Sequence, residues 1–241
     1  MSNPIGWTDQ TWNPITGCTK VSEGCLHCYA ERMSERLAGR YGYPADHPFR
    51  VTLHSDKLVE PVRWRKPRHV FVCSMGDLFH DDVPFDRIMD VWDVMGECSQ
   101  HTFQVLTKRP ERMREFARWM EDVELMRCAH SNVWLGVTAE NQARANERIP
   151  VLLDTPAAVR FVSVEPMLEP VDIMPWLHSL SRTDTALDWV ICGPETGPGA
   201  RPFDIQWACD LRDQCAEAGV PFWFKGGLLD GVEWHERPDH A

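Results

Sequence analysis

The sequence predicts an α/β fold, a partial (β/α)6 TIM-like barrel with a mostly parallel sheet. Short runs of β-branched and aromatic residues recur about thirty residues apart, which is the length of one βαβ step. Segments with apolar residues at helical spacing stand between most of these runs. The 241 residues suit one such domain spanning 1–241, because single α/β barrels commonly run to roughly 250 residues.

Six runs are predicted as strands, because each is nearly continuous in apolar residues, as in sheets covered on both faces. They are 69–74, 102–107, 133–138, 159–164, 188–193 and 220–225. Helices are predicted over 84–99, 110–122, 140–153 and 204–218. The last helix should end at Gly219, since a glycine readily adopts the left-handed C-cap conformation. Residues 37–68, rich in Pro, Tyr and His, are expected to form an irregular surface excursion.

The composition indicates a globular protein with an acid excess, 25 Lys and Arg against 36 Asp and Glu, and a net charge of −11. This charge argues against coating nucleic acid by bulk charge, although a local basic stripe could still hold phosphates. The first ten residues lack signal-peptide features, and no run of about 18 apolar residues occurs. Nine cysteines, six of them scattered, do not fit a disulfide scaffold. We therefore expect a cytoplasmic protein with no membrane partner.

Polar residues follow every predicted strand, at the end of the sheet where parallel barrels carry their chemistry. Among these residues are Ser74, Gly76, Asp77, Lys108, Glu140, Glu165, Glu195 and Lys225. Any one of them could be a cap or a member of a structural ion pair. A series from six strands that alternates acid and base favours one polar pocket instead.

Three cysteines stand within the N-terminal segment 13–32: Cys18, Cys25 and Cys28. Their spacing suits a metal centre at the start of a helix, where the helix dipole favours thiolates. Zinc would require a fourth ligand. Histidines available for that position are His27, His47 and His54. An iron–sulfur cluster on three thiolates would instead leave one iron open for a cofactor or substrate.

The cysteine segment, Gly-Cys-x6-Cys-x2-Cys-Tyr-Ala, resembles the cluster loop of radical S-adenosylmethionine (SAM) enzymes, whose usual spacing is C-x3-C-x2-C. Asn-Pro-x-x-Gly-Cys before it, Cys-Ser-Met-Gly-Asp-Leu-Phe at 73–79 and Leu-Thr-Lys-Arg at 106–109 are similar to the spore photoproduct lyase branch. The spacer between Cys18 and Cys25 is three residues longer than the usual one.

Five further motifs are spread along nearly the whole chain: Trp-Thr-x-x-Thr-Trp-Asn-Pro, Met-Gly-Asp-Leu-Phe-His, Thr-Lys-Arg-Pro-Glu-Arg, Arg-Phe-Val-Ser-x-Glu-Pro and Gly-Pro-Gly-Ala-Arg-Pro. In these motifs the chain resembles the phage-associated three-cysteine-motif family.

The radical SAM resemblance implies a [4Fe–4S] cluster on the three cysteines that binds SAM, takes an electron from an external donor and generates a 5′-deoxyadenosyl radical. It implies that the cofactor-binding residues are Tyr29, Ser74, Gly76, Asp77, Lys108, Glu140, Glu165 and Arg201. Candidate catalytic residues at the strand ends are Cys73, Cys192, Glu195 and Lys225.

The resemblance to photoproduct lyase suggests a nucleic acid base or nucleotide as the substrate. Basic residues at 63–68 and 108–112, with Trp64 among them for base stacking, agree with this expectation. The alternative is a zinc- or cluster-binding module that recognises a partner protein without catalysing a reaction.

Overall fold

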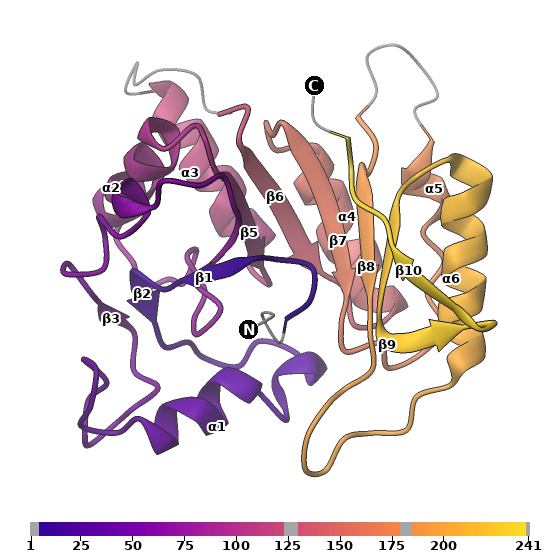
Figure 1. Ribbon diagram of the computed structural model, residues 1–241, viewed down its shortest axis with the longest axis horizontal. Helices are drawn as coiled ribbons and strands as arrows, with labels where there is room; N and C mark the ends of the chain where they lie inside the picture. The colour runs from indigo at the N-terminus through magenta and orange to yellow at the C-terminus, as the bar shows by residue number, and fades with distance from the viewer. Residues whose placement is uncertain (1–4, 123–129, 179–184, 240–241) are drawn as a thin grey trace.

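The computed structural model describes residues 5–122, 130–178 and 185–239. Its main feature is a curled, mostly parallel sheet that forms a half-barrel, with most of the helices on the outer face (Figure 1). In spatial order the strands are β1 (Gln10–Trp12), β4 (His69–Val72), β5 (Thr102–Thr107), β6 (Val133–Thr138), β7 (Val159–Val164), β8 (Trp189–Cys192), β9 (Phe222–Leu229) and β10 (Val232–His235). Neighbours from β1 to β9 pair in parallel, and β10 pairs antiparallel with β9.

The helices connect successive parallel strands, as in βαβ units. They are α1 (Tyr29–Arg36), α2 (Phe85–Glu97), α3 (Pro110–Asp122), α4 (Gln142–Leu153), α5 (Met174–Leu177) and α6 (Ile205–Ala218). Side chains cap two of them, because Asn141 accepts a hydrogen bond from the Arg144 amide and Asp204 accepts one from the Gln206 amide. Gly219 ends α6 with a φ of 69°, which confirms the predicted left-handed cap.

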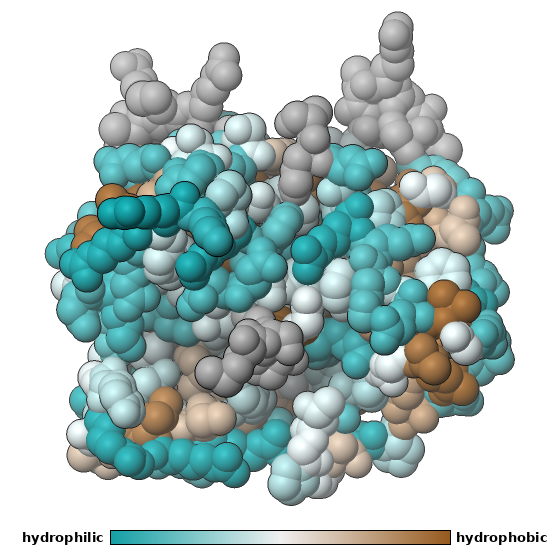
Figure 2. All heavy atoms as spheres, in the orientation of Figure 1, coloured by the Kyte–Doolittle hydropathy of each residue, from teal (hydrophilic) through white to brown (hydrophobic). Residues whose placement is uncertain are grey.

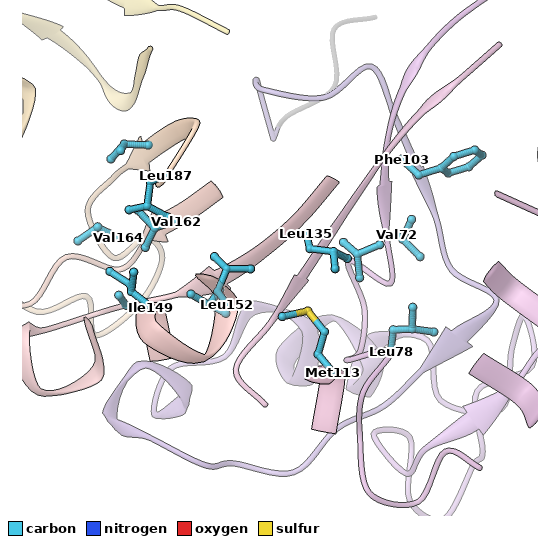
Figure 3. Close-up of a cluster of buried hydrophobic side chains, with 14 of the residues drawn as sticks. Val72, Leu78, Phe103, Met113, Leu135, Ile149, Leu152, Val162, Val164 and Leu187 are labelled. Carbon is cyan, nitrogen blue, oxygen red and sulfur yellow. The ribbon is translucent and has the colours of Figure 1, made fainter. Parts of the chain in front are cut away.

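The outer face of the sheet and the helices enclose the larger apolar core. Figure 3 shows part of it, with Val72, Leu135 and Val162 from the sheet beside Met113 of α3 and Ile149 of α4. Alternate residues along a strand face opposite sides of a sheet, so each of these strands presents its other face to the inside of the half-barrel. The outer face therefore supplies most of the packing, and the inner face remains for a different set of side chains.

Toward the amino ends of the strands, the inside of the half-barrel is filled by mostly aromatic side chains of the inner face, which we call the aromatic floor. This second core cluster contains Trp7, Trp134, Phe161, Trp189, Ile191 and Trp223. Gly136 makes room for it, because a Cβ at that position would lie 2.5 Å from the Phe161 ring. Nearer the carboxyl ends of the strands on the same face, Thr138 of β6 and Ser163 of β7 are paired in register. The inner face thus changes from an aromatic floor to polar groups toward the carboxyl ends of the strands.

The predicted elements agree with this fold in part. The six predicted strands correspond to β4 through β9, and the four predicted helices correspond to α2, α3, α4 and α6. The structure adds β1 and β10 to the sheet, so a six-stranded count was too low for the described residues. Both additions are short or polar: β1 contains three residues, Gln-Thr-Trp, and β10 has no buried position and two exposed polar residues, Glu233 and His235. Such strands lack the apolar run that identifies a buried parallel strand.

The excursion predicted over 37–68 contains two short elements. The strand β3 (Thr52–Leu53) pairs antiparallel with β2 (Ile15–Thr16), and η2 (Pro61–Arg63) is a single 3-10 turn. A similar turn, η1 (Glu23–Cys25), precedes α1. The β2–β3 pair fixes the chain just before the first cysteine and so helps to position the cysteine segment.

One edge of the sheet ends in the β9–β10 hairpin. Figure 2 shows mostly hydrophilic residues on the face of Figure 1, with an apolar patch over this hairpin, where Leu228 and Val232 are exposed. In the described part of the chain, no helix combines the length and apolar character needed to cross a bilayer.

Candidate functional site

A cavity of about 460 Å³ opens at the carboxyl ends of the parallel strands. Its volume lies within the roughly 300–1,000 Å³ usual for small-molecule sites. The predicted site residues that line it are Cys18, Cys25, Cys28, Tyr29, Cys73, Ser74, Gly76, Asp77, Lys108, Glu165, Glu195 and Lys225. The predicted residues outside its lining are Glu140, Cys192 and Arg201. The fold therefore gathers most of the predicted set around one space.

The cysteine segment is fastened to the sheet directly before Cys18. Gly17 forms a parallel bridge with Gly76, and its amide donates to the Met75 carbonyl over 2.9 Å. Gly17 has a φ of +87°, and a Cβ there would lie 2.3 Å from the Arg50 carbonyl oxygen. Only glycine combines this conformation with so close an approach of two backbones. The next amide, that of Cys18, donates to the Phe49 carbonyl, so the first cysteine leaves a fixed piece of backbone.

All three cysteines of the segment are free thiols with partial exposure. Cys28 is the N-cap residue of α1, and Cys25 ends η1. In the residues described, no three His, Cys, Asp or Glu side chains gather closely enough to hold a metal ion. The histidines considered as zinc ligands either contact other side chains or lie outside the cavity lining. His54 contacts Thr16 over 2.7 Å, His27 contacts Glu195 over 3.0 Å, and neither His47 nor His54 lines the cavity.

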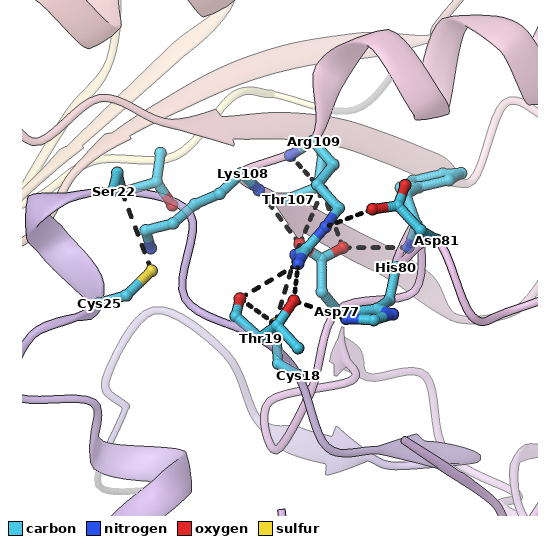
Figure 4. A network of polar contacts seen from close by, with 12 residues as sticks. Cys18, Thr19, Ser22, Cys25, Asp77, His80, Asp81, Thr107, Lys108 and Arg109 are labelled. Atoms are coloured by element: carbon cyan, nitrogen blue, oxygen red, sulfur yellow. Dashed lines mark hydrogen bonds and ion pairs between the residues drawn. The ribbon is translucent and has the colours of Figure 1, made fainter. Parts of the chain in front are cut away.

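A buried polar network lies between the first cysteine and the ends of β4 and β5 (Figure 4). Asp77 accepts hydrogen bonds from the Thr107 hydroxyl at 2.8 Å, from the Phe79 amide at 3.0 Å and from Arg109 at 3.2 Å. Arg109 also donates to Cys18 Sγ over 3.3 Å. Asp77 is thus committed to protein partners, although the sequence suggested it as a cofactor ligand.

Burial, followed by the nearby Asp77 carboxylate, raises the pKa of Cys18 to about 11, and the Arg109 guanidinium opposes this rise. The other cation beside the cysteines is Lys108. Its backbone amide binds Asp77, while its side chain extends toward Cys25 (Figure 4). Arg109 therefore serves the network, and the Lys108 ammonium faces the cavity.

Glu140 lies outside the cavity and supports the cysteine segment from behind. Its side chain is completely buried, and its carboxylate pairs with the buried Arg148 of α4 over 2.9 Å. Its other oxygen accepts a hydrogen bond from the Gly24 amide. Burial would raise the pKa of Glu140, but Arg148, Lys108 and the Ser22 hydroxyl together hold it below its ordinary value. The structure therefore places Glu140 as a structural anchor of the loop between Cys18 and Cys25.

Glu195 joins the loop after β8 to the cysteine segment. Its carboxylate accepts hydrogen bonds from the Arg201 side chain at 2.5 and 2.9 Å and contacts His27 at 3.0 Å. The hydrogen bonds from Arg201 lower the pKa of Glu195 to about 2, despite opposition from burial. Arg201 is occupied by this ion pair. Arg32 of α1 also binds this loop, at the carbonyls of Thr196 and Pro198.

Another part of the cavity lining comes from β6, β7 and β9. Glu165 and Lys225 pair with each other there, and both line the cavity. Ser163 lies beside them with 1% of its surface exposed, and its hydroxyl has no hydrogen-bond partner in the described part of the chain. A buried hydroxyl without a partner is unfavourable unless a ligand or water completes it. This part of the lining therefore presents an ion pair and an unused hydroxyl to a ligand.

Tyr29 and Ser74 also line the cavity. Tyr29 is 53% exposed at the start of α1. The Ser74 hydroxyl donates to the Asn13 side chain, and the same Asn13 oxygen accepts from the Met75 amide.

The two cysteines proposed as catalytic candidates have different surroundings. Cys73 lines the cavity, is 3% exposed and has a φ of 58°, a left-handed conformation that is uncommon for a residue with a side chain. Cys192 is fully buried and contacts Met167 over 3.5 Å. Both thiols belong to the outer core cluster, but Cys192 does not line the cavity. Burial raises the pKa of both thiols.

One family model matches residues 2–237, under the description "Protein of unknown function (DUF5131)". The match spans nearly the whole chain. The chain belongs to the DUF5131 family. No curated protein and no solved structure matches it significantly. For this DUF5131 protein, function must be argued from the site itself.

Sequence reasoning missed several residues that organise this DUF5131 site. Arg109 was noted at a strand end, in the Leu-Thr-Lys-Arg motif and in a basic run, without a role of its own, and His27 only as a possible zinc ligand. Asn13, which holds the turn after β4, belongs to the Trp-Thr-x-x-Thr-Trp-Asn-Pro motif but has no chemical signal of its own. An arginine next to a strand-end lysine gives no indication of which of the two binds Cys18, since both line the cavity.

Proposed function

We propose that this DUF5131 protein is a radical SAM enzyme with a [4Fe–4S] cluster on Cys18, Cys25 and Cys28. The observation that carries the proposal is the placement of three free thiols of one segment on the wall of one ligand-sized cavity. The curled sheet supports the finer interpretation of the fold as a partial (β/α)6 TIM-like barrel, because its parallel strands follow one another in chain order. When bound, the cluster and SAM supply a 5′-deoxyadenosyl radical that abstracts hydrogen from a substrate.

The donor set fits such a cluster better than a single ion. In a [4Fe–4S] cluster each cysteine binds a different iron, so the three sulfur atoms need not converge on one point. This agrees with thiols that share a cavity without gathering at single-ion spacing. Two cations stand beside them, Arg109 in hydrogen-bond contact with Cys18 and Lys108 pointing toward Cys25. Arg109 opposes the rise in the pKa of Cys18 that burial causes, and so reduces the cost of the thiolate form that binds metal.

The remaining lining residues suit the binding of SAM. The Lys108 ammonium would hold the SAM carboxylate, and the Ser74–Gly76 backbone, fixed by Asn13, would face the amino group. In the lining from β6, β7 and β9, the Ser163 hydroxyl and Glu165 would take the ribose hydroxyls, with Lys225 holding the Glu165 carboxylate in place. Tyr29 lies at the mouth, where its backbone would meet the adenine.

The surroundings of the cavity suit radical chemistry. The aromatic floor excludes water from beneath, which protects a reactive intermediate from side reactions. The Cys73 thiol, kept protonated by burial, is the lining group that could return a hydrogen atom to the product. Because the eight cysteines among the described residues are all free, a reducing compartment such as the cytoplasm suits the protein.

Anaerobic reconstitution tests this proposal. The wild type should bind about four irons per chain, show a thiolate-to-iron charge-transfer band, and release 5′-deoxyadenosine from SAM after reduction. Cys18→Ala, Cys25→Ala and Cys28→Ala should each lose iron and SAM cleavage. Matched controls on α6, Cys209→Ala and Cys215→Ala, should keep both, because these thiols belong to the core. A wild type without iron or cleavage product would refute the proposal, as would full activity in Cys18→Ala.

The second candidate is a zinc- or cluster-binding module that recognises a partner protein without catalysis. Asp77 and Glu195, which the sequence suggested as cofactor-binding and catalytic residues, are instead occupied by protein partners, and this favours the alternative. One zinc per chain after anoxic purification, with no iron and unchanged SAM, would select this alternative.

A nucleic acid base or nucleotide stays the predicted substrate. Residues 37–68 carry seven Lys and Arg against three Asp and Glu, within a chain whose net charge is −11. The excursion is therefore locally basic, and Arg68 stacks on the Trp64 ring at 5.1 Å. Residues 63–68 precede β4 and do not line the cavity, so they would contact a nucleic acid outside the cavity, near the amino ends of the strands. Binding of single-stranded DNA that weakens with salt would support this prediction, and binding independent of salt would contradict it.

A further inference from the structure

We propose that Arg109 is a positioning residue that holds the Cys18 thiolate and raises the reduction potential of the cluster bound to it. The inference rests on the proposed function, because it assigns a second role within the same site. Neither the basic character of residues 108–112 nor the strand-end position of Arg109 assigns this role to it.

The guanidinium of Arg109 joins three parts of the site at once. One terminal nitrogen, Nη1, donates to Cys18 Sγ at 3.3 Å and to Asp77 at 3.2 Å. The other, Nη2, donates to the Thr19 hydroxyl at 2.8 Å and to the Thr19 carbonyl at 3.1 Å. A planar guanidinium directs its N–H groups in fixed directions, whereas a lysine ammonium is a point charge on a flexible stem. Lysine therefore could not serve all these acceptors from one position.

The orientation of Arg109 is itself fixed by its neighbours. Its side chain is 7% exposed, and its own amide donates to the Thr107 hydroxyl. That hydroxyl in turn donates to Asp77, which holds the guanidinium. A rigid donor of this kind keeps its hydrogen bond to sulfur without reorganisation when the charge on the sulfur changes.

The charge balance around Cys18 indicates which property Arg109 affects. Asp77 nearly cancels the positive charge of Arg109, since the two groups are 3.2 Å apart and equally buried. What remains specific is the N–H···S hydrogen bond. Reduction adds one electron to the cluster, so its thiolate ligands become more negative and accept a stronger hydrogen bond. Hydrogen bonds to cluster sulfur atoms are among the factors that set its potential, and this one stabilises the reduced form.

The experiment compares reconstituted wild type with Arg109→Lys and Arg109→Gln. The matched control is Arg112→Lys, one turn along α3, where the arginine stacks on Phe85 and does not line the cavity. Iron per chain is measured first, followed by the midpoint potential of the cluster in a redox titration monitored by electron paramagnetic resonance. The rate of iron loss to a chelator is the second readout. Neither measurement requires SAM cleavage.

We expect a more negative potential and at least threefold faster iron loss in both Arg109 variants, with wild-type values in Arg112→Lys. An Arg109 variant with full iron and an unchanged or more positive potential would overturn the inference while leaving the proposed function intact. A wild type that takes up no iron would instead refute the proposed function. If the Arg109 variants do not fold, Thr19→Val removes one anchor of the guanidinium. It should shift the potential in the same direction by less, and an unchanged potential there would equally overturn the inference.

Discussion

Replacing Arg148 by methionine should strongly destabilise the protein, because it would leave a buried carboxylate without its partner. Glu140 and Arg148 have 0% and 1% of their side chains exposed, and 2.9 Å separates their charged atoms. Arg148 also donates to the Thr138 carbonyl at 2.8 Å. Methionine fills a similar volume but offers no donor, so the Glu140 carboxylate would keep only weaker partners such as the Gly24 amide.

Removing one member of a buried ion pair costs about 3–5 kcal/mol, and total domain stability is only about 5–15 kcal/mol. Arg148→Met should therefore lower the melting temperature by roughly 6–20 °C for a chain of this size. The loss should shrink as the pH falls. Without Arg148, burial raises the pKa of Glu140 above its unfolded value, so the folded state takes up a proton and gains stability at low pH.

Urea unfolding followed by tryptophan fluorescence measures the effect. The double variant Arg148→Met with Glu140→Gln should recover at least about 1.5 kcal/mol of the loss, because no buried charge remains. The control is Arg144→Met on the same helix, whose ion pairs with Glu23 and Glu147 are solvent-accessible and should contribute about 0–1 kcal/mol. A cost below about 1 kcal/mol for Arg148→Met, or strict additivity in the double variant, would refute this reasoning.

Three further changes test other parts of the structure. Gly136→Ala should cost about 1–3 kcal/mol in urea unfolding, because its Cβ would collide with Phe161, and a neutral result would contradict the packing described for the aromatic floor. In wild type, ionised Glu195 should contribute stability above pH 4.5, and this contribution should be lost as the pH falls toward about 2. Arg201→Gln should remove the contribution, and a free energy of unfolding with the wild-type pH profile would contradict this prediction. Cys192→Ala should cost about 1–3 kcal/mol in stability and leave SAM cleavage at the wild-type rate, whereas lost cleavage in a folded variant would restore this thiol as a catalytic candidate.

The sequence predicts the central strands and helices well because their patterns reflect local chemistry. Residues 133–138 are apolar or small throughout, and the corresponding strand β6 is buried at every position. The start of α6 was placed within one residue by Asp204, and its end by Gly219. The strand β1 was missed because Gln10 and Thr11 carry no such pattern. Its place in the sheet comes from parallel pairing with β4, almost sixty residues away in the chain.

The site was predicted as a set of residues but not as a set of contacts. Strand-end positions bring Asp77, Lys108 and Glu165 to one cavity, as parallel topology requires. Whether such a side chain faces a ligand or a neighbour depends on partners that are distant in sequence. Asp77, for example, binds Thr107 and Arg109, about thirty residues further on. Spacing along the chain contains no information about these choices.

The aromatic floor determines how ligands can reach the cavity. Trp134, Phe161 and Trp189 are completely buried, so the half-barrel is closed at the amino ends of the strands and a ligand cannot enter or leave there. A cofactor and a substrate that share this cavity would both approach from the carboxyl ends or from the open side of the half-barrel. If they share one entrance, the one that lies deeper binds first and leaves last, and turnover would follow a compulsory order of binding and release.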